Sequence, residues 1–299
     1  MMRMQTARAL RVQGATFCVV AAVVVLASLL LPRLSQQGEL FMAVALIALL
    51  GVPHGAFDAL FGQRLYDLRR AKNRVIFVAA YVLLATLVIA LWWMFPLLFL
   101  IAFLLVTIVH FSVDPLHGTR WVSRALHGGA IIVLPNLWHG DEVLTLFRFL
   151  VNRDADAAAL LRLSESLQWL ALPWLVAMTL CALYEARGSR WVALELIAMA
   201  VLAMVAPPLV AFTVFFCVMH STRHVLRTID YAGDNALRPL FVSAALAMLA
   251  VTVGAVAAFF VQTDASIDAR LVKIVFVGLA ALTVPHMMLV ERVRFRGWR

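Results

Sequence analysis

Apolar stretches of about 20 residues recur from residue 14 to residue 291, and no polar stretch long enough to form a soluble domain separates them. Hydrophobic residues make up 64% of the chain and charged residues 14%. A soluble domain is about 45–50% apolar and about 25% charged. Because a spanning helix needs about 20 mostly apolar residues, the sequence predicts an all-α, polytopic transmembrane helical bundle.

Ten apolar segments are candidate spanning helices, and eight or nine remain if a short one only re-enters the membrane. Pro96 and Pro135 coincide with two of the boundaries, because proline lacks a backbone donor and restricts the residue before it. We expect residues 1–299 to form a single integral membrane domain with a core over about 39–291. The segments cover residues 14–32, 39–62, 75–94, 96–114, 121–137, 167–185, 191–206, 208–227, 239–261 and 271–291.

The segment from about 138 to 166 differs from the others because it mixes acidic, basic and apolar residues. Leu144, Phe147, Leu150 and Val151 recur at helical spacing. This pattern predicts an amphipathic helix on the outer surface of the membrane.

The distribution of Lys and Arg predicts the orientation. With the N-terminus inside, most of the 25 basic residues fall in cytoplasmic segments, as the positive-inside rule requires. This bias accounts for the net charge of +9, so we expect no nucleic-acid partner. We expect both termini in the cytoplasm of a multi-pass protein of the cell inner membrane. The outer segments hold only Arg33, Arg148, Arg153, Arg162, Arg270 and Lys273.

Four histidines lie inside the apolar stretches: His54 in GVPHGAFD, His110 in VHFSVD, and His220 and His224 in MHSTRH. A polar side chain at membrane depth is costly, so its presence there suggests a function. Imidazole is also the commonest protein ligand of transition metals. His220 and His224 are four residues apart and share a helix face, which lets them chelate one ion. The pattern predicts a metal centre buried in the membrane.

The expected topology places these four histidines in the cytoplasmic half of the bilayer, because inside arginines follow them within a few helical turns. His127 and His286 fall in the same layer. His117 falls in a cytoplasmic loop and His139 on the outer side, so both are poor candidates. A single buried histidine is more often a satisfied core residue, but four at one depth favour a common site.

Two aspartates follow two of these histidines at an offset of four residues: Asp58 after His54, and Asp114 after His110. Metal-bound histidines usually donate their other ring N–H to a carboxylate or carbonyl. We expect Asp58 and Asp114 to accept such bonds, from the same helix or from a neighbouring one. The alternatives are that Asp58 marks a helix end and that Asp114 begins a turn before Pro115.

Six further residues near the motifs are candidates for a pocket beside the metal. Aromatic side chains at such positions serve core contacts more often than substrate contacts, so both interpretations stay open. The set comprises Phe57, Phe111, Phe215, Phe216, His127 and His286.

The motifs PHGAFD, HFSVD and HSTRH, with LTVPHMML around His286, together resemble the Brp/Blh family of membrane β-carotene 15,15′-dioxygenases. The similarity covers about residues 39–291, and the ordered set of four motifs is specific. The resemblance implies an oxidoreductase that takes β-carotene from membrane lipid. It implies cleavage of the central 15,15′ double bond by O₂, giving two molecules of all-trans-retinal.

The resemblance also implies an Fe(2+) cofactor held by four histidines. By motif, the metal-binding and catalytic residues carry over onto His54, His110, His220 and His224. His127 and His286 are not identified as ligands. A related carotenoid remains an alternative substrate.

Other functions fit less well. Membrane di-iron desaturases need about eight histidines in several clusters, and a zinc protease needs the H-E-x-x-H motif. A b-type cytochrome with facing histidines, or another histidine-ligated enzyme acting on a different carotenoid, stays open. So does a non-catalytic transporter or a carotenoid- or retinal-binding protein, since proline-broken helices occur in transporters.

Overall fold

The computed structural model describes residues 2–116, 118–151, 156–232, 237–263 and 265–295, and every regular element in these ranges is helical. The expected all-α class is confirmed. The elements are α1 (Met2–Leu30), α2 (Gln36–Leu46), η1 (Ile47–Gly51), η2 (Val52–Phe57), α3 (Asp58–Tyr66), α4 (Ala71–Met94), α5 (Pro96–Phe111), α6 (Trp121–Val133), η3 (Leu134–Leu137), α7 (Gly140–Leu150), α8 (Ala157–Glu185), α9 (Arg190–Val205), α10 (Pro208–Val214), η5 (Phe215–Ser221), α11 (Thr222–Ala232), α12 (Leu237–Val261) and α13 (Ile267–Phe295).

Within the described ranges, seven helical stretches are long and apolar enough to cross a membrane. Three of the ten expected segments form shorter helices, namely α5 with 16 residues, α6 with 13 and α9 with 16. The α6 helix ends early because Pro135 follows in the 3₁₀ turn η3. The seven stretches are Ala7–Leu30, Gln36–Tyr66, Ala71–Met94, Ala157–Glu185, Pro208–Ala232, Ala244–Val261 and Ile267–Val293.

Two of the seven stretches change helix type along their length. In Gln36–Tyr66, the π-helical turn η1 and the 3₁₀ turn η2 separate α2 from α3, and Pro53 lies in η2. In Pro208–Ala232, the π-helical segment η5 lies between α10 and α11. Such π segments occur frequently at functional sites.

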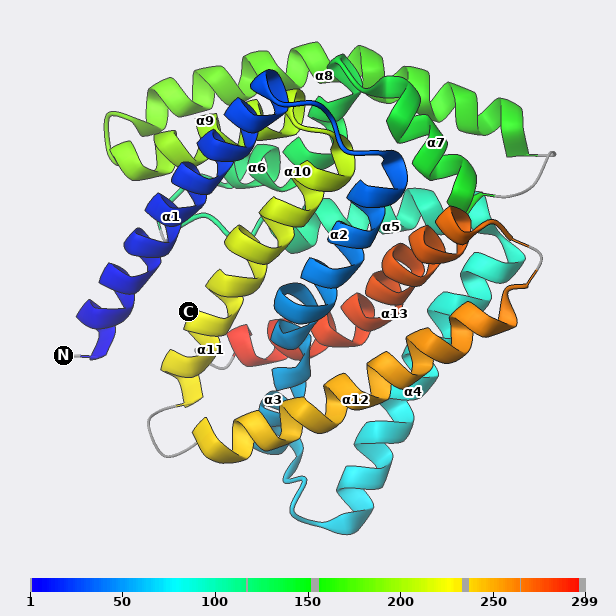
Figure 1. Ribbon diagram of the computed structural model, residues 1–299. Helices are drawn as coiled ribbons and strands as arrows, with labels where there is room; N and C mark the ends of the chain where they lie inside the picture. The colour runs from blue at the N-terminus through cyan, green and yellow to red at the C-terminus, as the bar shows by residue number, and fades with distance from the viewer. Residues whose placement is uncertain (1, 117, 152–155, 233–236, 264, 296–299) are drawn as a thin grey trace.

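The helices pack in an oblique bundle (Figure 1). Helix α9 packs against both α1 and α8, and α13 contacts α2, α3, α4 and α7. The largest apolar core joins α5, α6, α8, α9, α10 and η5. Helices α4 and α12 lie at the edge, where α4 buries none of its residues.

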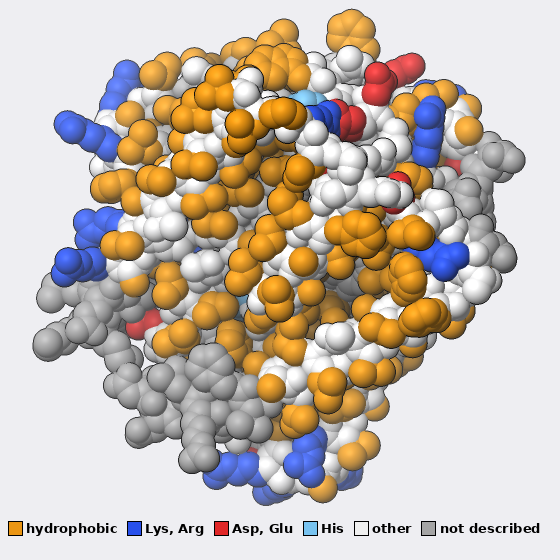
Figure 2. Space-filling model, viewed as in Figure 1, with side chains coloured by type: hydrophobic (Ala, Val, Ile, Leu, Met, Phe, Trp, Pro, Cys, Tyr) orange, Lys and Arg blue, Asp and Glu red, His pale blue; other side chains and the backbone are white. Residues whose placement is uncertain are grey.

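The surface is largely apolar, with orange side chains over most of the face shown in Figure 2. Trp169 on α8 is 83% exposed and Val261 on α12 is 80% exposed. A soluble protein rarely exposes a continuous apolar surface of this extent. The exposed side chains therefore face lipid, as the hydropathy of the chain predicts.

The segment expected to form an amphipathic surface helix is divided in the structure. Residues 140–150 form α7, residues 152–155 lie outside the described residues, and α8 begins at Ala157. Val143, Phe147 and Leu150 form the buried face of α7. The apolar side of this helix is therefore turned into the protein.

Candidate metal centre

Five histidine rings from separate parts of the chain form one buried cluster. The rings come from η2, α5, η5, α11 and α13, and all five residues are buried. The centroid separations are 4.4 Å for His110–His220, 4.9 Å for His224–His286, 5.0 Å for His54–His220, 5.3 Å for His54–His286, 5.4 Å for His54–His224 and 5.5 Å for His110–His286. The structure thus brings together the four histidines predicted to bind metal and adds His286 to them.

The broken helices explain how His54 and His220 meet. A Cβ atom at Gly51 would lie 2.5 Å from the Phe216 ring, so only glycine lets η1 approach η5 this closely. The carbonyl oxygen of Gly51 accepts a hydrogen bond from the Ser221 hydroxyl at 3.1 Å. The same oxygen lies 2.5 Å from Nδ1 of His54, which therefore donates to it. These bonds leave Nε2 as the ring nitrogen available for a ligand role.

Two aspartates orient two of the histidines. Both carboxylate oxygens of Asp114 lie 3.0 Å from Nδ1 of His220. The carboxylate of Asp58 lies 2.7 Å from Nδ1 of His286, and its second oxygen accepts a hydrogen bond from Tyr81 at 2.9 Å. Each aspartate therefore accepts a hydrogen bond from a histidine that lies on another part of the chain, and not from the histidine four residues before it. Tyr81 on α4 is a further site residue. The sequence gives no signal for it, because it lies within an apolar helix.

The donor set fits a transition-metal cation. One ring nitrogen each from His54, His110 and His286 lies within 4.8 Å of the other two. In the described part of the chain, Nε2 of His220 and Nε2 of His286 are buried without a hydrogen-bond partner. A buried imidazole nitrogen without a partner is costly unless it binds something. An all-imidazole set with carboxylates behind it suits iron, zinc or copper.

The remaining predicted pocket residues lie in three different surroundings. Phe216 lines a groove beside the cluster, with its ring 5.4 Å from His54 and 5.7 Å from His220. Phe111 and Phe215 support the other side, where Phe111 lies 4.8 Å from the His220 ring. Phe57 packs in a small core with Ala56 and Ala244, and His127 is buried 5.7 Å from the Phe215 ring.

A buried ion pair that the sequence analysis did not identify lies behind Asp114. Arg223 is fully buried and bonds both carboxylate oxygens of Glu195, at 2.7 and 3.0 Å. It also donates to the backbone carbonyl of Asp114 at 2.9 Å and to the amide oxygen of Gln13 at 2.7 Å. Glu195 is an acidic residue in an otherwise apolar segment, which is a signal for a buried partner.

A lateral groove of about 510 Å³ leads from the cluster to the edge of the bundle. Its walls come from η2, α3, α4, η5, α12 and α13, and His54 and His286 are among the residues that line it. Apart from Asp58, Tyr81, Thr283 and the two histidines, the lining is apolar or glycine. Val82 and Leu246, which line it, are 57% and 66% exposed on α4 and α12. The groove therefore faces the region where lipid would lie.

A family model described as Beta-carotene 15,15′-dioxygenase matches residues 45–293. The chain belongs to this family. The Beta-carotene 15,15′-dioxygenase of uncultured marine bacterium 66A03 is 30% identical over 257 residues, which cover 83% of this chain and 92% of that protein. No solved structure matches the chain. The resemblance carried by the four motifs is confirmed.

The chain is therefore a carotenoid-cleaving dioxygenase, and the non-catalytic alternatives are excluded. All five clustered histidines of this dioxygenase lie within the matched residues, as do Asp58 and Asp114. Helix α1 precedes the matched residues, although Gln13 reaches the ion pair behind Asp114.

Proposed function

We propose that this dioxygenase cleaves the central 15,15′ double bond of β-carotene with O₂, giving two molecules of all-trans-retinal, and that the reaction depends on iron(II). The observation that carries the proposal is a buried all-histidine cluster, two of whose histidines line an apolar groove open to the membrane side. A carotenoid dissolves in lipid and not in water, so its cleavage requires a site reached from the bilayer.

The proposed iron ligands are His54, His110, His220 and His224. His286 becomes a fifth candidate, because it has the same arrangement as His220: a carboxylate at Nδ1 and a buried Nε2 directed elsewhere. When bound, iron(II) supplies the redox chemistry that activates O₂. Asp114 and Asp58 fix the ring directions of His220 and His286, so that these rings need not reorganise.

The chain itself positions the substrate and excludes water. A polyene offers no groups for hydrogen bonding, so its position is set by the shape of the apolar walls. Phe216 and Phe77 present ring surfaces to it. Holding the reacting bond in one place converts binding contacts into rate acceleration. The buried cluster also protects reactive species from water.

We further propose that the protein lies in the cell inner membrane with the histidine cluster in its cytoplasmic half. The start of α1, the turn between α8 and α9, and the end of α13 lie on one side of the bundle, at the left of Figure 1. These regions carry much of the positive charge of the chain.

Expression in bacteria that accumulate β-carotene tests the function. The wild-type protein should remove the colour and yield retinal in the extract, and the purified protein should contain iron in near-stoichiometric amount. His54→Ala, His110→Ala and His220→Ala should each lose retinal formation and bound iron. His139→Ala is the matched control, because His139 bonds Glu142 away from the cluster. Unchanged carotenoid despite normal protein in the membrane would exclude β-carotene as the substrate.

A further inference from the structure

The π-helical segment η5 carries His220, and a side chain from α1 bonds the backbone just before this histidine. A π turn departs from the regular i→i−4 ladder, so some of its buried carbonyl oxygens need other donors. The side-chain amide of Gln13 donates to the carbonyl oxygen of Val218 at 2.7 Å and to that of Met219 at 3.3 Å. The two carbonyls that immediately precede His220 are therefore both held from α1.

The other end of the Gln13 amide reaches His220 by a second route. Its oxygen accepts a hydrogen bond from Nε of Arg223 at 2.7 Å. Because arginine only donates and a carbonyl only accepts, these partners fix which way the amide is turned. Arg223 also donates to the backbone carbonyl of Asp114 at 2.9 Å, and the Asp114 carboxylate lies 3.0 Å from Nδ1 of His220. Gln13 therefore supports both the backbone that carries the His220 ring and the loop whose aspartate orients that ring.

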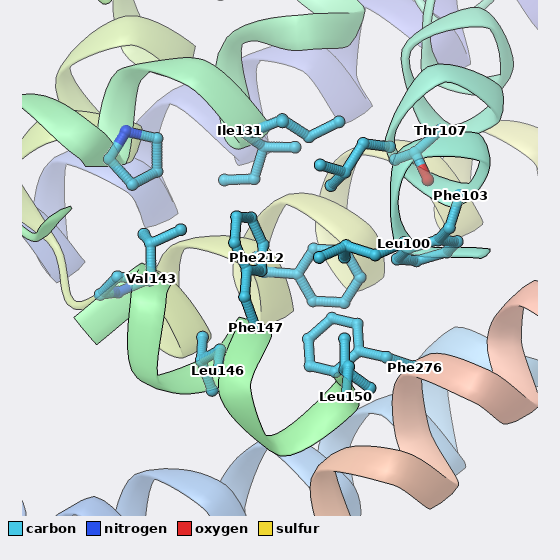
Figure 3. A pocket seen from close by; sticks show the side chains of 14 residues that line it. Leu100, Phe103, Thr107, Ile131, Val143, Leu146, Phe147, Leu150, Phe212 and Phe276 are labelled. Carbon is cyan, nitrogen blue, oxygen red and sulfur yellow. The ribbon is translucent and has the colours of Figure 1, made fainter. Parts of the chain in front are cut away.

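The part of this stretch that precedes η5 packs among apolar side chains. Phe212 on α10 lines a small apolar cavity of about 80 Å³, whose lining contains no charged side chain (Figure 3). Directly after η5, the hydroxyl of Thr222 donates to the carbonyl oxygen of Cys217 at 2.9 Å. Among these side-chain bonds to the carbonyls that precede His220, those of Gln13 are the nearest to the histidine.

We propose that Gln13 is a positioning residue for the metal centre: it holds η5 so that Nε2 of His220 points at the proposed iron. This inference rests on the proposed ligand role of His220. Among the described residues Nε2 of His220 has no hydrogen-bond partner, so the direction of the ring depends on its backbone and on Nδ1. Gln13 is only 6% exposed, and a buried amide costs free energy unless its groups are bonded. Helix α1, which precedes the matched residues 45–293, thereby becomes part of the support of the site.

Two replacements of Gln13 in the full chain test this role. Gln13→Met keeps the length of the side chain and removes its hydrogen bonds. Gln13→Glu keeps the acceptor for Arg223 but, when ionised, has no donor for the two carbonyls, and it serves if Gln13→Met does not fold. Each purified protein is stripped of metal and loaded with Co²⁺, whose visible absorption depends on the number and geometry of its ligands. Competition with a graded chelator then measures the affinity for Fe²⁺, and neither measurement relies on turnover.

Three further variants serve as controls. Thr16→Val, on the exposed side of α1, removes only a hydrogen bond to the Val12 carbonyl within the helix. Phe17→Leu lies one turn after Gln13 on the same buried face, so it weakens the packing of α1 without removing a hydrogen bond. His220→Ala tests the ligand role on which the inference rests.

We expect both Gln13 variants to shift the Co²⁺ absorption and to bind Fe²⁺ about 10-fold more weakly, because residues behind a ligand fix its direction. Thr16→Val should match the wild type, and Phe17→Leu should lower the unfolding temperature and leave the Co²⁺ absorption unchanged. Wild-type absorption and iron affinity in both Gln13 variants, or an equal shift in Phe17→Leu, would overturn the positioning role. If His220→Ala binds both metals as the wild type does, the ligand role of His220 fails, and the inference fails with it. A wild-type protein that binds neither metal would overturn the proposed metal centre itself.

Discussion

Asp58 and His286 are 228 residues apart in sequence, and their side chains are joined by a 2.7 Å hydrogen bond between Oδ1 and Nδ1. Tyr81 completes the arrangement by donating to the other carboxylate oxygen at 2.9 Å. The bonds tie α3, α13 and α4 together at the lateral groove. They hold the His286 ring with its Nε2 among the other histidines, which makes Asp58 a positioning residue for the proposed iron.

Asp58→Asn should weaken iron binding by about 10–100-fold, because an amide is a poorer acceptor for the His286 N–H than a carboxylate. Iron content after dialysis against a graded chelator measures this loss without relying on turnover. Asp67→Asn is the matched control, since Asp67 is exposed and its left-handed backbone conformation tolerates asparagine. Full iron retention in Asp58→Asn would remove Asp58 and His286 from the proposed centre.

His286→Ala and His224→Ala should differ in their content of bound iron if only one of the two histidines is an iron ligand. The ligand variant should lose bound iron, whereas the other should keep iron and show slower cleavage. Iron content and retinal formation are measured on the same preparations. Equal iron content in both variants and in the wild type would contradict the assignment of either residue as a ligand.

Removing one partner of the buried Arg223–Glu195 pair should lower the free energy of unfolding far more than replacing both partners. Glu195→Gln or Arg223→Met alone leaves a buried charge without its partner and should lower the free energy of unfolding by about 3–5 kcal/mol. The double variant Glu195→Gln/Arg223→Met should lose less than the sum of the two single changes. Thermal unfolding in detergent measures all three. Strict additivity would show that the two side chains do not act as a pair.

Helix α1 should be held against α9 through Gly14. A Cβ atom at Gly14 would lie 2.1 Å from Oε1 of Glu195, and that oxygen is fixed by Arg223. Gly14→Val should therefore lower the unfolding temperature and disturb the ion pair. Gly254→Ala on α12 is the control, because its added Cβ meets no atom within 4 Å. An unchanged unfolding temperature for Gly14→Val would show that α1 does not need this close contact.

The ion pair between Arg33, in the loop after α1, and Glu142 on α7 should be lost in acid. Burial raises the pKa of Glu142, but the hydrogen bonds from Arg33 and His139 lower it more, so its pKa lies below the ordinary value. A carboxylate with a lowered pKa stabilises the folded state above its unfolded pKa of about 4.3, and this contribution disappears as the pH falls through the folded pKa.

Because both side chains are partly exposed, the Arg33–Glu142 pair should contribute less than about 1 kcal/mol. Glu142→Gln should unfold at a slightly lower temperature than the wild type near neutral pH and at the same temperature near about pH 3. Asp141→Gln, on the neighbouring residue of α7, is the control. If the unfolding temperatures of Glu142→Gln and the wild type differ as much in acid as at neutral pH, ionised Glu142 is not the cause of the difference.

The helical class and the histidine motifs were predictable because they depend on local properties. Hydropathy over about 20 residues and the spacing of His220 and His224 can be read without knowing any helix neighbour. Helix length was less predictable: α6 ends before Pro135, and α5 and α9 also stop short of a full span. Hydropathy also does not distinguish a helix that is buried in protein, as α6 is from Leu126 to Val133, from one that faces lipid.

The rest of the site depends on which helices pack against one another. An offset of four residues places two side chains on one helix face, but it does not determine which residues they contact. Asp58 follows His54 in sequence yet bonds His286, and Asp114 follows His110 yet bonds His220. His286 enters the cluster only because α13 packs against η2. The groove between α4 and α12 and the cavity behind Phe212 likewise exist only between helices. Local hydropathy and helical period thus specify a membrane bundle that carries histidines, and tertiary packing assembles them into one site.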